Sequence, residues 1–470
     1  MKREPKCNRK KARYARLPEH LQHINLNAAG IDVGSGSVFA AVPQGRDVET
    51  VREFPCYTAD LHRLADWLVE CQIDTVVMES TGVYWIPVFE LLESRGFAVQ
   101  LVNARHVKNV PGRKTDVLDC QWLQQLHTYG LLQGSFRPPE LVCALRAYLR
   151  QRANLVRYAS AHIQHMQKAL TQMNLLLHNV VSDLTGTTGM RIMKAILAGE
   201  RDPVALANLR DPRCKNSVET IRRSLEGHYR DEHLFTLQQA VDLYEVYQTR
   251  IAECDRQIEH HLQRFEVKTD DSAPQPPQPG KKQKNTPGFE LHAHLFRITG
   301  VDLTRIDGLD AHSILKLVSE TGIDMTPWRT EKHFTSWLGL CPGNKVSGGK
   351  NLSGKTKPAV NRAASVFRLA AHGLHNSKSA LGAYLRRQKA RLGAPKAITA
   401  TAHKLARIYY RMLKSGTAYV DAGQDYYEEQ YRKRVVHNLS RKAHAMGLTL
   451  VPIESQHPDS AVPQTQCATA

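Results

Sequence analysis

The sequence predicts an α/β domain followed by a longer, mostly α-helical region. From Ala28 to about Gly130, short apolar strands alternate with amphipathic helices. After Pro138 and Pro139, apolar residues recur at helical spacing instead. A proline-rich stretch from Lys268 to Gly288 then divides the helical region. Because 470 residues exceed the size of one ordinary core, these changes of pattern are expected to separate domains.

The α/β stretch is predicted to contain three strands, then helix, strand, helix, strand and helix. The helices are expected at about Asp60 to Cys71, around Val88 to Leu92, and from Asp116 with Thr115 as its N-cap. The strands are expected at Ile31 to Val33, Val38 to Val42, Val51 to Phe54, Thr75 to Met78 and Val99 to Val102. This order is that of a ribonuclease H-like fold.

Two long helices with apolar stripes are expected next, from Leu141 to Met173 and from Leu237 to Phe265. Gln248 and Asp255 interrupt the second stripe. Such stripes fit a coiled-coil hairpin or dimer interface, and they fit an antiparallel pair within one subunit equally well. Between the two helices, the polar stretch from Leu184 to Arg222 is expected to be irregular.

We therefore divide the chain into six parts. They are 1–26, a basic N-terminal arm; 27–135, the ribonuclease H-like domain; 138–267, the coiled-coil region; 268–289, a flexible linker; 290–415, a mostly helical C-terminal domain; and 416–470, a helical extension that ends in a disordered tail.

The charge balance favours a polyanionic partner. The chain has 64 Lys and Arg against 45 Asp and Glu, a net charge of +19. Each phosphate that Lys or Arg neutralises releases condensed counterions, so such an excess is typical of nucleic-acid binding. A basic protein with a disordered tail has the same composition.

The cysteines and hydropathy point to a reduced, non-membrane setting. The nine cysteines contain no Cys-x-x-Cys pair, so we expect free thiols rather than a zinc ribbon or disulfide framework. No apolar run approaches the roughly 18 residues that span a bilayer. Residues 1–16 are basic but lack the apolar segment of a signal peptide. We therefore expect a soluble, cytoplasmic protein.

Four acidic residues form the first candidate site. Asp32 lies within the first strand and Glu79 at the end of another, while Asp116 and Asp119 stand three apart at a helix start and share one face. In a ribonuclease H-like fold these positions converge, and such a set requires counter-charge. Mg²⁺ is the cation that suits hard oxygen ligands best, and two ions about 4 Å apart support phosphodiester cleavage. Taken singly, the acids also fit ordinary roles as a helix cap, a solvated strand end and a surface charge.

A competing interpretation concerns the segment Gly30 to Ser37, which resembles the first phosphate loop of sugar kinases and actin-like ATPases. Those proteins also need a second Asp-Gly phosphate loop and a glycine-rich adenosine pocket. The sequence has no convincing copy of either, so kinase chemistry is the lesser alternative.

The second candidate site is the segment Trp337 to Lys350. Ser347 precedes two glycines, which permit close backbone approach, and a serine that attacks DNA phosphate conserves the bond energy in a phosphoserine ester. On the residues alone, a flexible Ser-Gly turn is favoured, and Ser353 is a second candidate nucleophile. The lysines around Ser347 are Lys345, Lys350, Lys355 and Lys357.

Two further features suggest phosphate contacts. The turn Ile306 to Leu309 is similar to a helix-hairpin-helix turn, whose backbone amides grip phosphate, although a plain helix-helix turn fits equally well. The candidate nucleic-acid-binding residues outside the serine segment are Arg105, Lys108, Arg113, Lys114, Arg362 and Arg368.

Taken together, these segments resemble the DEDD transposases of insertion-sequence family 110, including its 1111 subgroup. The resemblance is carried by Met78 to Trp85, Val102 to Arg105, Gly112 to Asp119, Ile306 to Gly308, Trp337 to Pro342, and Ser347-Gly348. The chain departs from the family at Cys120, where alanine is usual, at Asp307, where proline is frequent, and in its long linker.

The resemblance implies that Asp32, Glu79, Asp116 and Asp119 bind Mg²⁺ in a RuvC-like domain. It also implies that Ser347, five residues after Pro342 as in the family, is the nucleophile. The implied partners are donor and target DNA, a noncoding bridge RNA as guide, and further copies of the chain. Dimers to tetramers would form through the coiled coil, in a bacterial cytosol near the nucleoid.

Two alternatives come from other classes. One is a metal-dependent, RuvC-like junction nuclease that uses water and needs no serine. The other is a non-catalytic protein that packages DNA or RNA and binds it with steep salt dependence.

Overall fold

The structure is a computed structural model that describes residues 25–80, 82–103, 116–269, 284–348, 350–356 and 361–451. Of residues 116–118, 345, 346, 350 and 351 it describes the backbone alone. The chain forms two compact units, Met1–Arg137 and Pro138–Ala470. None of the helices in these ranges is both long and apolar enough to cross a membrane.

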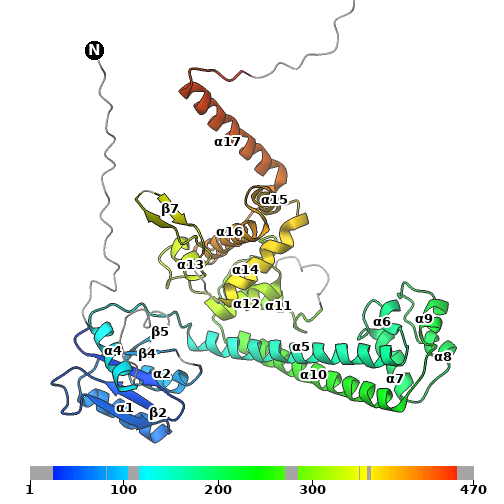
Figure 1. Cartoon of the computed structure of the whole chain (residues 1–470), viewed down its shortest axis with the longest axis horizontal. Coiled ribbons are helices and arrows are strands. Elements are labelled where there is room, and N and C mark those ends of the chain that lie inside the picture. The colour runs from blue at the N-terminus through cyan, green and yellow to red at the C-terminus, as the bar shows by residue number, and fades with distance from the viewer. Residues whose placement is uncertain are drawn as a thin grey trace, which may run out of the picture. The chain divides into compact units, whose positions relative to one another are not determined.

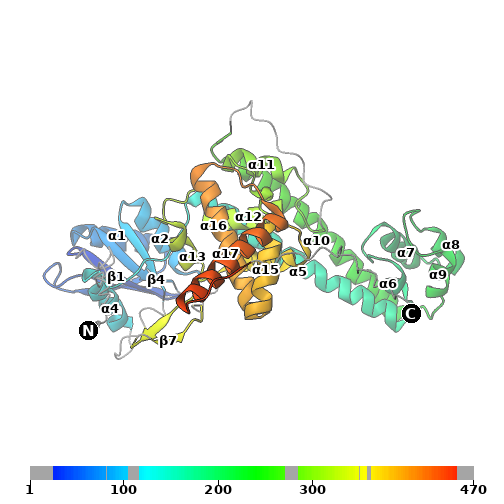
Figure 2. The same cartoon turned by 90° about the horizontal axis from the view of Figure 1, so that it is seen from above.

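The first unit is built on a mixed five-stranded sheet in the order β3-β2-β1-β4-β5. β1 pairs antiparallel with β2 and parallel with β4, which pairs parallel with β5. Figure 2 labels β1 and β4 in this sheet. The strands are β1 (Ala28–Val33), β2 (Ser37–Ala41), β3 (Val51–Pro55), β4 (Thr75–Glu79) and β5 (Ala98–Val102). All five predicted strands are confirmed, each within a few residues of its expected ends.

Helices cover both faces of this sheet. Leu64 and Leu68 of α1 (Thr58–Glu70) and Leu92 of α2 (Trp85–Ser94) share one apolar core with strand residues. On the other face, α4 (Asp116–Thr128) packs Leu123 and Leu126 against Val77 and Val102. The predicted order of strands and helices is therefore confirmed.

The second unit begins with two long antiparallel helices, α5 (Glu140–Gln172) and α10 (Asp231–Gln263), which pack against each other within one chain (Figure 1). Their direction is evident because His261, near the end of α10, lies 2.7 Å from the carbonyl oxygen of Leu141 at the start of α5. The two predicted helical stripes are thus confirmed as one intramolecular pair.

The prediction of an irregular stretch from Leu184 to Arg222 was wrong. Short helices there close the end of the helical pair around their own apolar core. The misleading polar residues are caps: Asp202 accepts hydrogen bonds at the start of one helix, and Ser217 accepts one at the start of another. The helices are α6 (Leu177–Val180), α7 (Thr187–Leu197), α8 (Pro203–Asn208) and α9 (Val218–Ser224).

Asp255, which interrupts the apolar stripe of α10, forms a buried ion pair. The Arg152 guanidinium on α5, only 3% exposed, donates to Asp255 at 2.5 Å and to the Asn285 carbonyl oxygen at 3.0 Å. The Gly288 amide donates to the same carboxylate at 3.1 Å. The end of the segment assigned to the linker is therefore fixed to the helical pair, while 270–283 lie outside the described residues.

The C-terminal part of the second unit is mostly helical, as predicted. Its core contains Phe334, Phe367 and Tyr409, which are all fully buried. The elements are α11 (Leu291–Thr299), η2 (Leu303–Arg305), α12 (Ala311–Thr321), α13 (Glu331–Trp337), β6 (Lys345–Ser347), β7 (Lys350–Ser353), α14 (Arg362–Gly373), η3 (Leu374–Asn376), α15 (Ala380–Leu392), α16 (Ala394–Ser415) and α17 (Gly423–Ala445).

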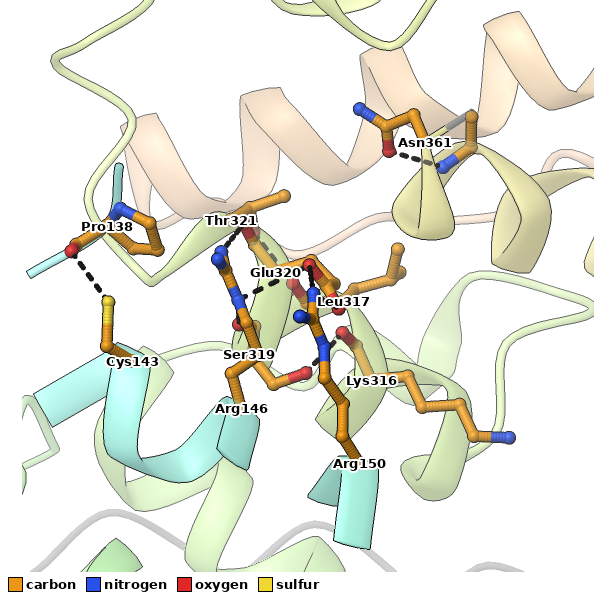
Figure 3. Close-up of polar contacts among 11 residues, drawn as sticks. Pro138, Cys143, Arg146, Arg150, Lys316, Leu317, Ser319, Glu320, Thr321 and Asn361 are labelled. Carbon is orange, nitrogen blue, oxygen red and sulfur yellow. Dashed lines mark hydrogen bonds and ion pairs between the residues drawn. The ribbon is translucent and has the colours of Figure 1, made fainter. Parts of the chain in front are cut away.

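Arginines of α5 join the helical pair to this part of the unit (Figure 3). Arg146 donates to the carbonyl oxygens of Ser319 and Glu320 at 3.0 Å, at the end of α12. Arg150 donates to the Glu320 carboxylate, also at 3.0 Å. Because arginine fixes several oxygens at once, these contacts hold α5 and α12 in one orientation.

The turn Ile306 to Leu309 packs inside this part of the chain. Gly308 has φ +88°, and a Cβ there would lie 3.0 Å from the Ala370 carbonyl oxygen of α14. Asp307 accepts a hydrogen bond from the Ser377 hydroxyl. These contacts fit a structural helix-helix turn, and its phosphate-binding role stays a prediction.

Replacing Asp255 by Ala is expected to leave the Arg152 charge buried without its carboxylate. Removing one partner of a buried ion pair costs about 3–5 kcal/mol, whereas replacing both with apolar residues costs far less. Urea denaturation followed by circular dichroism is expected to give a much larger loss for Asp255→Ala than for the double variant Arg152→Leu with Asp255→Leu. Equal losses for the two proteins would show that the charge pairing is not what matters there.

Candidate functional site

The register between β1 and β4 puts two of the predicted carboxylates side by side. Gly30 is paired with Val77 and Ile31 with Met78, so the next step sets Asp32 beside Glu79. Neighbouring strands are roughly 4.8 Å apart. Both residues are at the carboxyl ends of these parallel strands, and both are partly exposed.

Alternation along the strands assigns both carboxylates to the face that α4 covers. Ile31 and Met78 belong to the opposite core, beneath α1 and α2. Val77 packs with α4, so Glu79, two residues on, has the same orientation. For β1, the close contact of Gly30 with α4 assigns the same face to Asp32.

Gly30 lets α4 approach β1 closely. A Cβ at Gly30 would lie 2.3 Å from both the Cys120 carbonyl oxygen and the Gln124 amide nitrogen of α4. The face of β1 at Gly30 is therefore in direct contact with helix backbone. Asp32 follows two residues later, which directs it toward the beginning of the same helix.

Asp119 belongs to that beginning of α4, and the thiol of Cys120 reports on its surroundings. The pKa of Cys120 is raised to about 12, chiefly by burial, and the nearby negative charges of Asp32 and Asp119 contribute to the rise. Two carboxylates from distant parts of the sequence thus act on one buried thiol. The structure brings Asp32, Glu79 and Asp119 to one edge of the sheet.

Asp116 is the first residue of α4, one turn before Cys120, and its backbone alone is described. Arg105, Lys108, Arg113 and Lys114 lie outside the described residues. Among the side chains that the structure describes, no three Asp, Glu, His or Cys residues form a ready-made metal cluster. The described carboxylates nevertheless fit Mg²⁺ in chemistry, because they are partly exposed oxygen donors gathered at one edge.

Ser347 lies at the tip of a two-stranded hairpin. It is the last residue of β6 and is exposed, and it pairs with Lys350 across the turn. Gly348 in that turn has φ +54°, a conformation that glycine adopts easily. The predicted flexible turn is therefore the end of a defined hairpin.

The base of the hairpin is attached to the core of the second unit. The Gly343 amide donates to the Lys355 carbonyl oxygen at 2.9 Å, which extends the pairing beyond β6 and β7. Just before it, the Cys341 thiol contacts the Thr335 hydroxyl at 3.3 Å. Thr335 is fully buried in α13, so the packed core holds the hairpin from its open end.

Glu331 fixes α13, and with it the approach to the hairpin. Its carboxylate forms ion pairs with Arg407 and Arg411, both on α16. Burial alone would raise the pKa of Glu331, but the hydrogen bonds and positive charges of Arg407 and Arg411 outweigh it and lower that pKa. The carboxylate therefore stays charged at neutral pH.

The two candidate serines differ in their surroundings. Ser353, the last residue of β7, is partly buried, and its hydroxyl accepts a hydrogen bond from the Lys355 amide at 3.3 Å. Ser347 is exposed at the tip, where a bound strand has access to it. The geometry favours Ser347 over Ser353 as the residue that meets a substrate.

The basic residues near the hairpin are only partly described. Lys355 and Arg362 are exposed, and Arg368 is partly buried on α14. Lys345 and Lys350 are described by their backbone alone, and Lys357 lies outside the described residues.

Two structural features of these sites were missed from the sequence. The hairpin had a signal, since two short runs separated by Gly-Gly are typical of tight β-turns. Gly30 was considered only as part of a phosphate loop, whereas its contact is with a helix about ninety residues later in the chain.

Two comparisons with known families match successive parts of the chain. A family model described as a transposase, of the DEDD type of IS110, matches residues 29–175. A second, described as the transposase of the IS116/IS110/IS902 family, matches residues 302–384. No individually curated protein matches the chain.

Both matches are to transposases, so the chain is similar to that class of protein in two separate segments. More particularly, the resemblance to the transposases of insertion-sequence family 110 is confirmed in both units of the chain. The first match contains all four predicted carboxylates and the second contains Ser347, which argues against the kinase interpretation of Gly30 to Ser37.

Replacing Gly30 by Ala is expected to separate α4 from β1, because the new methyl group overlaps helix backbone. Such overpacking costs about 1–3 kcal/mol, measured as a lower midpoint in urea denaturation. Gly36→Ala is the matched control, since a Cβ there meets nothing within 4 Å. If the two variants are equally stable, α4 does not sit as closely on β1 as we describe.

Proposed function

We propose that the protein is the transposase of a mobile insertion sequence, a DNA recombinase with a serine nucleophile and Mg²⁺-binding carboxylates. Its first unit would be a RuvC-like domain of the ribonuclease H fold. The observation that carries the proposal is that the two transposase matches enclose the two candidate sites, one in each unit.

Asp32, Glu79, Asp116 and Asp119 would hold the metal. Bound there, Mg²⁺ would stabilise the charge that develops on phosphate oxygens during strand cleavage. The carboxylates themselves orient the site: Asp32 and Glu79 stand on adjacent strands, and Asp119 stands on the helix above them. The negative charge of this set also explains why a cation is needed before a phosphate strand can approach.

Ser347 would attack the phosphorus of the scissile phosphodiester. Its Oγ forms the new P–O bond, the bond to the leaving deoxyribose oxygen breaks, and the hydroxyl proton passes to a base and finally to that oxygen. The product is a phosphoserine ester, which a second deoxyribose hydroxyl attacks in turn to rejoin the strand. Since one ester replaces another, no external energy source is required.

Donor and target DNA are the proposed substrates, and a noncoding bridge RNA is the proposed guide. The net charge of +19 suits both nucleic acids. The carboxylates and the serine belong to different compact units, which fits a dimer or tetramer in which one subunit's serine serves another's carboxylates. The helical pair α5 and α10 is the proposed contact between subunits.

Ser347→Ala is expected to abolish the covalent link between protein and DNA and to slow recombination by at least about a thousandfold. The measurement is denaturing electrophoresis of labelled DNA after incubation with protein, guide RNA and Mg²⁺. Ser353→Ala is the matched control and should retain the covalent species. Normal recombination by Ser347→Ala would end the serine proposal.

Asp32→Asn is expected to lower strand cleavage by roughly a thousandfold, because several kcal/mol of charge stabilisation are lost. Glu53→Gln, an exposed carboxylate on β3, is the control and should cleave normally. Hydrolysed ends without a covalent adduct would instead select the water-using junction nuclease. Unchanged behaviour of Asp32→Asn in every reaction would favour a protein that only binds nucleic acid.

A further inference from the structure

The last helix, α17, has its charges separated along its length. Its first nine residues, 423–431, contain Asp425, Glu428 and Glu429 but no Lys or Arg. From residue 432 to residue 451 there is no Asp or Glu. The cations of this second part, which we call the basic end, are Arg432, Lys433, Arg434, Arg441 and Lys442.

The acidic first part of α17 is docked on α15 and α16. Arg387 of α15 forms an ion pair with Glu428, and its guanidinium lies 3.6 Å from the centre of the Tyr431 ring. Lys404 of α16 lies 4.6 Å from the ring centre of Tyr384 on α15 and 5.7 Å from that of Tyr427 on α17. Cation–π contacts and an ion pair therefore attach the first two turns.

The basic end has no such support. No residue of α17 is buried, and Val436 and Leu439 are each 47% exposed. Among the described residues, the ion pair of Lys433 with Glu429, one turn earlier on the same helix, is the one that the basic end makes. A helix end without buried side chains gains little from packing and is only marginally stable in water, so a partner would stabilise it.

The charge distribution indicates what that partner is. Arg432, Lys433 and Arg434 are consecutive, and successive residues point about 100° apart, so cations lie on three sides of the helix. Two turns later Arg441 and Lys442 extend the charge. A site with anions on both sides of a helix suits this arrangement, whereas a flat anionic surface would engage one side alone.

We propose that the basic end of α17 binds duplex DNA by entering the major groove and contacting the phosphates on both walls. The major groove of B-form DNA is about 12 Å wide and admits an α-helix, whereas that of A-form RNA is too narrow. The inference rests on the proposed function in taking DNA as the partner. It goes beyond that function because α17 follows both matched segments, which end at residues 175 and 384.

The test is equilibrium binding of the full chain to a labelled DNA duplex, measured by fluorescence anisotropy at several salt concentrations. EDTA is present to remove divalent metal, and the anisotropy reports binding and not reaction, so failure of the catalytic proposal leaves this experiment unaffected. The variant replaces Arg432, Arg434, Arg441 and Lys442 by Ala. We expect binding roughly a hundredfold weaker, and a salt slope shallower by about 0.9 for each lost phosphate contact.

The matched control exchanges the same residues while retaining charge, with Lys for each arginine and Arg for Lys442. It should bind DNA within a few fold of the original chain. Because α17 has no buried residue, neither variant should alter the thermal unfolding of the rest. Three results would overturn the proposal: unchanged DNA affinity in the Ala variant, an equal loss for a duplex of RNA, or a loss of association between copies with DNA binding intact.

Discussion

The close contact between α4 and β1 at Gly30 is the constraint on which the carboxylate site depends. With 2.3 Å between a would-be Cβ and helix backbone, a larger residue would lift α4 away from the strand. The contact brings the first turn of α4 over the end of β1, where Asp32 stands. The parallel register with β4 then adds Glu79. Neither element forms the site alone, because each contributes acids that are distant in sequence.

In the second unit, the proposed nucleophile Ser347 is exposed and yet belongs to a defined hairpin. Ser347 itself is exposed, but the hairpin that carries it follows α13, whose Phe334 and Thr335 are fully buried. The ion pairs of Glu331 with α16 hold α13 against that helix, and the contacts of Arg146 and Arg150 join α12 of the same unit to α5. Firm support beneath an exposed side chain suits the attack on a DNA strand that we propose for Ser347.

Much of this architecture could be predicted because local pattern determines it. Continuous apolar runs gave the strands of the first unit, and stripes at helical spacing gave α5 and α10. The acids were found because Asp32 lies within a predicted strand, Glu79 at the end of another, and Asp116 and Asp119 at the start of a predicted helix. Contacts over long separations could not be predicted. The sequence showed that Asp255 interrupts the apolar stripe of α10, but the partner of Asp255, Arg152, lies 103 residues earlier. The strands β6 and β7 are too short for alternation to stand out, and the caps Asp202 and Ser217 made short helices look like loops.

Metal binding tests the central claim, that Asp32, Glu79 and the start of α4 meet around a cation, most directly. Mn²⁺ replaces Mg²⁺ at oxygen sites and can be counted by electron paramagnetic resonance without any nucleic acid or reaction. The account predicts at least one tightly bound Mn²⁺ per chain, which the double variant Asp32→Asn with Glu79→Gln loses while retaining its fold. The same number of bound ions at the same affinity in both proteins would contradict it.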